Sequence, residues 1–215
     1  MKKKIIAFLK IISIPMVVIM ICAMCVSRAD MQSPKVDTIS EIEVPQFEFS
    51  IATDYSYLMM RSVCDGNYVK GKEYERLRNL KKEYLGMTDN LTYDDLLLLS
   101  KVVHTESGSS WLTEEHRQLV ASVVINRVNS SAFPNSVYDV VYQKGQYANV
   151  GTKYFESIIP SETSAQAALS ILLNGSIAPS NVVFQSNFKQ GSGVYKTITD
   201  SKLGTTYFCY SKSIA

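Results

Sequence analysis

A long apolar run at the N-terminus excludes the first part of this chain from any folded domain. Lys2, Lys3 and Lys4 precede residues 5–26, a run interrupted by a charge only at Lys10. Basic residues before such a run are the pattern of an export signal. Their excess on the N-terminal side predicts that the chain beyond the run lies outside the cytoplasm. The sequence therefore predicts an exported protein.

The length of the run leaves open whether residues 1–29 are a cleaved signal peptide or a membrane anchor. Residues 11–26 make a helix of about 24 Å, which is short of a bilayer core of roughly 30 Å. Residues 5–26 make about 33 Å if the Lys10 side chain reaches the interface. Residues 27–29, Ser-Arg-Ala, offer a cleavage pattern. Lipidation at Cys25 is a third alternative, although the bulky Met24 precedes it.

The charge distribution argues against a nucleic-acid partner. The formal net charge is +2, from 22 Lys and Arg against 20 Asp and Glu. Five basic residues precede Asp30, the first acid, so 17 basic and 20 acidic residues remain beyond them, a net charge of −3. A protein that binds nucleic acid needs clustered basic residues to neutralise the phosphates, and the sequence beyond residue 29 has no such cluster.

Composition changes along the chain predict a tether followed by a folded domain. Residues 30–90 are predicted to be a linker or stalk, polar up to residue 50 and carrying short helices over 55–61 and 72–85. Gly86 stands where a helix C-cap glycine belongs. Residues 91–215 are dense in structure signals and are predicted to form the main domain.

The pattern within residues 91–215 predicts an α+β domain, mainly helical with a small antiparallel sheet near the C-terminus. Thr92 is expected to cap a helix over 96–106, and Thr113 a helix reaching about residue 129. A short helix over 136–142 and a longer one, capped by Ser161 or Ser164, follow. Three β-type runs over 182–185, 194–198 and 206–210 close the chain.

Few residues in this sequence could bind a metal. There are two His, His104 and His116, and two Cys beyond the apolar run, Cys64 and Cys209. We therefore expect no metal and no cofactor. An exported chain could join Cys64 to Cys209, and two free thiols are the alternative.

Glu106 is the candidate catalytic residue. It ends a long apolar helix and is followed by a Ser/Gly-rich loop over residues 107–110. A carboxyl there could be half buried and still face a cleft, which would raise its pKa and keep it protonated as a general acid. Such an acid can protonate a glycosidic oxygen. An ordinary surface Glu at a helix end is the alternative.

Four segments form an ordered set of motifs around Glu106: Val102 to Ser107, Val120 to Val128, Phe133 to Gln143 and Gly145-Gln146-Tyr147. In this order they resemble segments of the SleB-type cell wall hydrolases, a spore cortex-lytic family. The corresponding segments of that family are Val-Tyr-Ala-Glu-Ala, a helix ending in Asn-Arg-Val, Phe-Pro-Asn-x-Ile-Tyr-x-Val-Ile-Tyr-Gln, and Gly-Gln-Phe. The resemblance spans roughly residues 91–210.

The resemblance implies a lysozyme-like or lytic-transglycosylase-like fold with Glu106 as the one catalytic residue. It implies cleavage of peptidoglycan between N-acetylmuramic acid, or muramic lactam, and N-acetylglucosamine, as in cortex lysis during germination. Glycan strands are then the partner, with the membrane as a second one if residues 1–29 are uncleaved. Muramidase or amidase action on the same polymer, and a non-catalytic wall-binding protein on the same fold, stay open as alternatives.

Three further residues are candidates for binding the glycan. Gln146 and Tyr147 either line the glycan cleft or belong to a loop packed on the core, and Asn187 could donate to the glycan from a strand edge. Asn126 and Arg127 are expected to fix helix contacts instead.

The sequence also departs from the resembled family. In that family, Ala and then Arg-Gly-Glu commonly follow the catalytic Glu. In this sequence Ser107 and Gly108 follow Glu106. A Trp commonly lies between the late strands, whereas the one Trp of this chain is Trp111, with Tyr195 a substitute in the strands.

Overall fold

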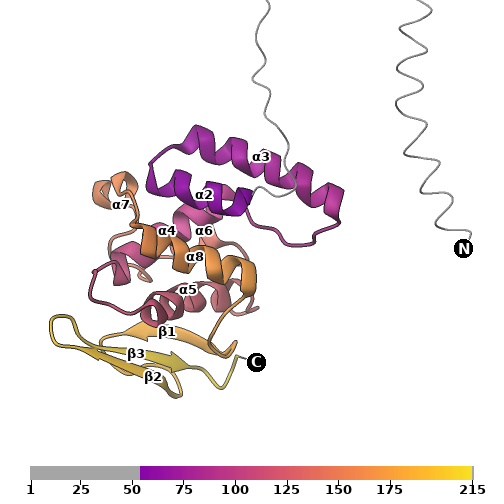
Figure 1. Cartoon of the computed structure of the whole chain (residues 1–215). Coiled ribbons are helices and arrows are strands. Elements are labelled where there is room, and N and C mark those ends of the chain that lie inside the picture. The colour runs from indigo at the N-terminus through magenta and orange to yellow at the C-terminus, as the bar shows by residue number, and fades with distance from the viewer. Residues whose placement is uncertain (1–53, 215) are drawn as a thin grey trace, which may run out of the picture. The chain divides into compact units, whose positions relative to one another are not determined.

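The computed structural model describes residues 54–214, so the predicted signal or anchor and the tether up to residue 53 lie outside it. The elements are α2 (Tyr55–Cys64), α3 (Tyr68–Leu85), α4 (Tyr93–Ser107), α5 (Glu114–Val128), α6 (Val137–Val141), α7 (Lys153–Ser157), α8 (Glu162–Asn174), β1 (Val182–Ser186), β2 (Gly193–Asp200) and β3 (Gly204–Tyr210). The predicted α+β class, mainly helical with a small C-terminal antiparallel sheet, is confirmed (Figure 1).

Side-chain caps begin the helices where the sequence predicts them. Thr92 Oγ1 accepts a hydrogen bond from the Asp95 N–H at 3.1 Å, and Thr113 Oγ1 accepts one from the His116 N–H at 3.2 Å. Ser161 is the residue that caps α8. Each cap satisfies a backbone donor that the first helical turn leaves unpaired. Short-range chemistry therefore sets where these helices begin.

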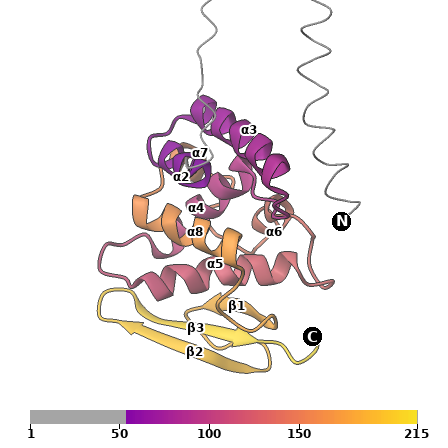
Figure 2. The same ribbon diagram turned by 45° about the vertical axis from the view of Figure 1, so that its right-hand side comes forward.

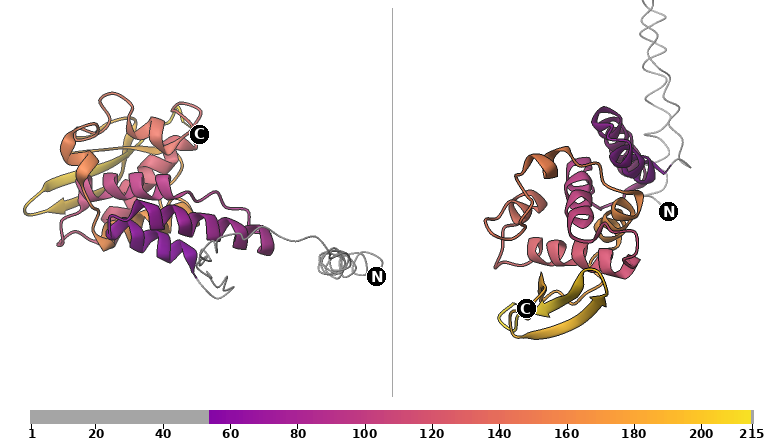
Figure 3. Two further views of the ribbon diagram at one scale, coloured as in Figure 1. Left: turned by 90° about the horizontal axis from the view of Figure 1, so that it is seen from above. Right: turned by 90° about the vertical axis from the view of Figure 1, so that its left-hand side faces the viewer.

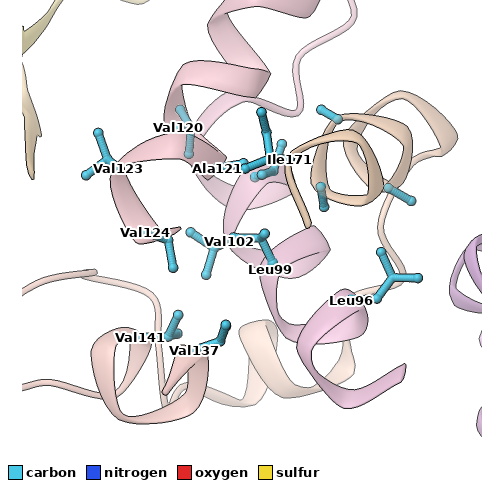
Figure 4. Packing of buried hydrophobic residues seen from close by; sticks show 14 of the residues in the cluster. Leu96, Leu99, Val102, Val120, Ala121, Val123, Val124, Val137, Val141 and Ile171 are labelled. Carbon is cyan, nitrogen blue, oxygen red and sulfur yellow. The ribbon is translucent and has the colours of Figure 1, made fainter. Parts of the chain in front are cut away.

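Helix α4 lies in the middle of the hydrophobic core. Its Leu96, Leu99 and Val102 are fully buried, and the helix packs against α5 and α8. Figure 4 shows side chains of α4, α5, α6 and α8 converging there. Each such side chain contributes roughly 1.5–3 kcal/mol by leaving water. Because α4 is held on several sides, the position of its C-terminal end is fixed.

Helices α2 and α3 belong to the same core. Helix α2 buries Met59, Met60 and Val63 in the hydrophobic cluster that holds the α4 side chains. Helix α3 comes close to α4 at Gly71, where an added Cβ would overlap the ring of Tyr93. The structure therefore differs from the predicted stalk over residues 55–85. Residues 55–85 contain few apolar side chains. Their sequence alone therefore does not indicate that these two helices pack against the rest of the domain.

The three strands lie in the order β1–β3–β2, with both pairings antiparallel. Figures 2 and 3 show this sheet on one side of α5, with α2 and α3 on the other side of the domain. Each pairing contains one register shift, between residues 182 and 184 in β1 and between 194 and 196 in β2. Such shifts bend a strand locally, which suits a small sheet wrapped against one helix.

Two buried side chains of α5 hold the beginning of β1. Asn126 Nδ2 donates to the carbonyl oxygens of Pro179 at 2.8 Å and Val182 at 2.9 Å. Arg127 Nε donates to the carbonyl oxygen of Val183 at 2.7 Å. The expected structural role of Asn126 and Arg127 is thus seen in the structure, although they contact a strand where a helix was expected.

Cys64 and Cys209 are free thiols, one at the end of α2 and the other buried in β3. Cys25 lies outside the described residues, as does the predicted anchor. Over residues 54–214, no helix combines the length and the apolar character that crossing a bilayer requires.

Replacing Gly71 tests the packing of α3 on α4. Helix propensity alone would make Gly71→Ala stabilising by about 1 kcal/mol. We predict instead that it lowers the free energy of unfolding by about 1–3 kcal/mol, because the new methyl group meets the Tyr93 ring. Urea denaturation of the full chain measures the change, with Lys70→Ala on the exposed side of α3 as the control. A stabilised Gly71 variant would contradict this packing.

Replacing Asn126 tests the attachment of β1. We predict that Asn126→Ala lowers the free energy of unfolding by about 1–3 kcal/mol, because the buried Val182 carbonyl loses the amide donor and the Pro179 carbonyl keeps only the Val182 N–H. The control is Gln118→Ala on the same helix, whose amide pairs only with Glu114 at the surface and should cost under about 0.5 kcal/mol. Similar losses in the two variants, again measured with urea, would refute the argument.

Candidate active site

Glu106 lies in the last turn of α4, one residue before the helix ends. The apolar side of the same helix is buried in the core, so the carboxyl is carried on a rigid element. Gly108 caps the helix, and a Cβ there would overlap the carbonyl oxygen of His104. Glycine thus lets the chain turn away directly after the carboxyl. This local geometry leaves Glu106 half-buried at the edge of a cavity.

The cavity at Glu106 has a volume of about 120 Å³ and forms where α4, α5, β1 and β3 meet. Besides Glu106 it is lined by His116, Val120, Gln185, Ser186, Asn187 and Thr206. Its polar groups come from four elements that are distant in sequence. Among the described residues that line it, Glu106 carries the only carboxyl group.

Burial controls the protonation of Glu106. Removal from water raises the pKa of its carboxyl above the ordinary value for Glu, and hydrogen bonding from the Gln185 side chain opposes this in part. Desolvation is the larger of these two effects on the pKa. It raises the pKa because burial penalises the charged form of the carboxyl. The carboxyl therefore keeps its proton to higher pH than an exposed Glu, which is the condition a general acid needs.

Polar atoms without a partner gather near this carboxyl. Gln185 Oε1 and His116 Nδ1, from residues that line the cavity, are buried and have no hydrogen-bond partner. Burial lowers the pKa of His116, so its imidazole is biased to the neutral form. Its ring meets that of Phe208 edge to face, with 5.7 Å between centroids. Buried polar groups are normally paired, so these atoms are suited to hydrogen bonding with a hydroxylated ligand.

Tyr147 contributes a further unpaired hydroxyl. The residue is buried, and burial together with the charge of Glu106 raises the pKa of its phenol to about 12, against the opposing charge of Arg127. The Arg127 guanidinium lies 5.7 Å from the centroid of the Tyr147 ring. The phenol thus stays protonated as a donor, and it is close enough to Glu106 to sense its charge.

The predicted binding residues differ in where they lie. Asn187 is exposed and lines the Glu106 cavity, just after β1. Tyr147 is buried behind that cavity and does not line it, and Gln146 is exposed without lining it. Their roles stay predictions. Gln185 and His116 were not among the predicted site residues, because Gln185 reaches Glu106 only when β1 packs on α5, and His116 only when α5 packs on α4.

Two other residues that the sequence analysis singled out lie outside this cavity. His104 Nδ1 accepts a hydrogen bond from the Ser161 N–H at 3.0 Å, which joins α4 to the start of α8. Trp111 lies against the turn between β2 and β3, where its indole N–H donates to Asp200 at 3.2 Å and Lys202 lies 4.2 Å above its ring. The loop that follows Glu106 is thereby tied to the sheet.

Comparisons with known proteins agree with the resemblance seen in the sequence. Two solved structures are similar to this chain. The catalytic domain of the Bacillus cereus SleB protein has 22% identity, a TM-score of 0.44, and coverage of 57% of this chain and 94% of its own. The catalytic domain of the germination-specific lytic transglycosylase SleB from Bacillus anthracis has 21% identity, a TM-score of 0.44, and coverage of 57% and 99%. No curated protein matched.

A family comparison covers the second half of the chain. Residues 113–208 match the family described as Cell Wall Hydrolase, a range that begins just after Glu106 and takes in α5 through most of β3. It includes every residue lining the candidate cavity except Glu106 itself. The resemblance predicted from the sequence is therefore confirmed over these residues, which are similar to the cell wall hydrolases.

Proposed function

We propose that this protein is a cell wall hydrolase that cleaves peptidoglycan glycan strands between N-acetylmuramic acid, or muramic lactam, and N-acetylglucosamine, as a lytic transglycosylase. The observation that carries the proposal is the Glu106 carboxyl, whose pKa is raised by burial at the edge of a cavity. A carboxyl that keeps its proton to higher pH than an exposed Glu can protonate a glycosidic oxygen, and the family supplies the polymer that contains such a bond.

In the proposed reaction Glu106 acts twice. The protonated carboxyl first donates to the glycosidic oxygen, and the bond from that oxygen to the anomeric carbon of the muramoyl ring breaks. The resulting carboxylate then takes the proton from the hydroxymethyl group of the same ring. The freed oxygen bonds to the anomeric carbon and forms an anhydro ring. Glu106 regains its proton, and no water is consumed.

The set of groups around Glu106 favours this route over hydrolysis. Glycosidases that use water, directly or after forming a covalent intermediate, generally need a second carboxylate. Among the described residues lining the cavity, none besides Glu106 has one. A muramidase or amidase acting on the same polymer, or a wall-binding protein without activity, would release different products or none.

The neighbouring polar side chains suit substrate positioning. The Gln185 amide hydrogen-bonds to the Glu106 carboxyl and fixes its orientation. The Asn187 amide, exposed at the cavity mouth, is placed to reach sugar hydroxyl or N-acetyl groups. We assign Tyr147 to the wall behind the carboxyl, and Gln146 to the exposed approach to the cleft.

We further propose that residues 91–215 form the catalytic domain and that residues 1–29 direct export, leaving the protein facing the wall either anchored or released. Helices α2 and α3 then serve as a fixed support on α4. An enzyme that acts on peptidoglycan must reach the outside of the membrane, and the charge pattern around residues 5–26 agrees with that requirement.

A digest of peptidoglycan tests the catalytic assignment. The full chain is incubated with purified vegetative wall and spore cortex, and soluble products are read by mass spectrometry. We predict anhydro-muramoyl ends, lighter than reducing ends by one water, and a loss of about 10²-fold or more in rate for Glu106→Gln. Glu114→Gln, which removes an exposed carboxyl on α5, is the matched control and should keep full activity.

Other products would change the assignment. Reducing ends that depend on Glu106 would make the enzyme a muramidase. Released peptides with intact glycan would make it an amidase, and near-full activity of Glu106→Gln would remove Glu106 from the mechanism. No product on either wall type would favour the wall-binding alternative.

The raised pKa of Glu106 also predicts how stability changes with pH. The folded chain holds this proton to higher pH than the unfolded chain does. The Glu106 contribution to stability is therefore complete below about pH 4.3, the ordinary Glu pKa, and falls as pH rises through the folded value. Gln cannot ionise, so Glu106→Gln should gain stability over the natural chain across this range. Urea denaturation at pH 4 to 8 measures the difference, and a pH-independent one would contradict the burial argument.

A further inference from the structure

A second concave surface lies on the outward side of α4, away from Glu106. One cavity of about 290 Å³ extends between α4, α6 and α7. A second, of about 300 Å³, extends towards the α2–α3 turn. Leu97, Lys101 and Glu156 line both, so the two cavities are neighbours on the same surface. We call this surface the α4 trough.

The α4 trough has an aromatic wall. The rings of Tyr138 and Tyr142 stack with 4.5 Å between centroids and 27° between planes. Tyr138 is 59% exposed, so its outer face is open to a ligand. Leu98 and Phe155 continue the apolar lining. Apolar and aromatic walls with a few placed polar groups are the usual composition of binding sites for small molecules and sugars.

The polar groups beside this wall are already held in place. Tyr142 Oη donates to Glu156 Oε1 at 2.8 Å, and Lys101 Nζ donates to the Glu156 carbonyl oxygen at 2.7 Å. Asp94 Oδ1 accepts from Tyr68 Oη at 3.0 Å. These carboxylates have lone pairs left for sugar hydroxyl and amide donors, and little side-chain freedom is lost on binding.

The charge of the trough indicates which ligand it accepts. Asp94, Asp95 and Glu156 line the 290 Å³ cavity together with Lys101, and Lys72 forms an ion pair with Asp94 at 3.2 Å. Three carboxylates beside two cations leave the surface with a small negative charge. This charge disfavours a phosphate-rich polymer, whereas an uncharged chain of hydroxyl and N-acetyl groups would find acceptors.

We propose that the α4 trough is a second binding site for the glycan strand, in which a pyranose ring stacks on Tyr138 and its hydroxyl groups donate to the surrounding carboxylates. The inference rests on the proposed function for its choice of polymer. The two trough cavities share no lining residue with the Glu106 cavity. The trough is thus distinct from the catalytic cavity, and it would keep the enzyme on an insoluble wall between cleavage events.

Binding assays with an inactive chain test the trough. The full chain carrying Glu106→Gln is mixed with purified insoluble peptidoglycan, with glycan strands stripped of peptides, and with tetra-N-acetylchitotetraose. Tyr138→Ala in this background should weaken binding to all three about fivefold or more, the scale of losing one aromatic contact. Tyr138→Phe should retain binding because the ring remains. The matched control is Tyr154→Ala, since Tyr154 is 58% exposed on α7 and does not line the trough.

The outcomes separate this inference from the proposed function. Equal weakening by Tyr138→Ala and Tyr154→Ala, or no weakening by either, overturns the trough as a glycan site. Binding to whole peptidoglycan that needs Tyr138 but is absent with stripped strands and chitotetraose also overturns it, because the peptide would then be the ligand. Digestion by the chain with Glu106 intact is measured in parallel. Tyr138-dependent glycan binding without any digestion would support the trough and contradict the proposed function alone.

Discussion

The attachment of β1 to α5 is the interaction on which the candidate site depends. The Asn126 amide and the Arg127 guanidinium donate to three backbone carbonyl groups at the entry to β1. These bonds are buried, where an unpaired carbonyl would cost about 1–3 kcal/mol. They set the position of the strand against the helix, and so they decide where Gln185 and Asn187 lie relative to Glu106.

The site combines two opposing effects on one carboxyl. The core around α4 and α5 desolvates Glu106 and raises its pKa, while Gln185 stabilises the charged form. Because desolvation is the larger effect, the acid form persists to higher pH than in an exposed Glu, yet the charged form keeps a hydrogen-bond donor. A group that must first give a proton and then accept one needs both states to be accessible. The arrangement therefore matches the two-step use of Glu106 that we propose.

How far the sequence could predict this protein depended on the range of the interactions. The caps at Thr92, Thr113 and Ser161 act over three residues, and the helices begin where they indicate. Packing of α2 and α3 was missed because it depends on Met59 and Met60 finding a surface on other helices. The charged residues of α3 suggested a solvated stalk, and only the meeting of Gly71 with Tyr93 shows how closely α3 approaches α4.

The sequence by itself determined the α+β class, the helix starts, the three strands and Glu106 as the candidate acid. These follow from local chemistry: cap side chains, hydrophobic periodicity, and a carboxyl at the end of an apolar helix. Only the tertiary structure decided which groups surround that carboxyl. Gln185 reaches Glu106 because α5 holds β1 against the end of α4, and His116 reaches it because α5 itself packs on α4. Desolvation is likewise a property of the assembled core, so no residue pattern could supply it.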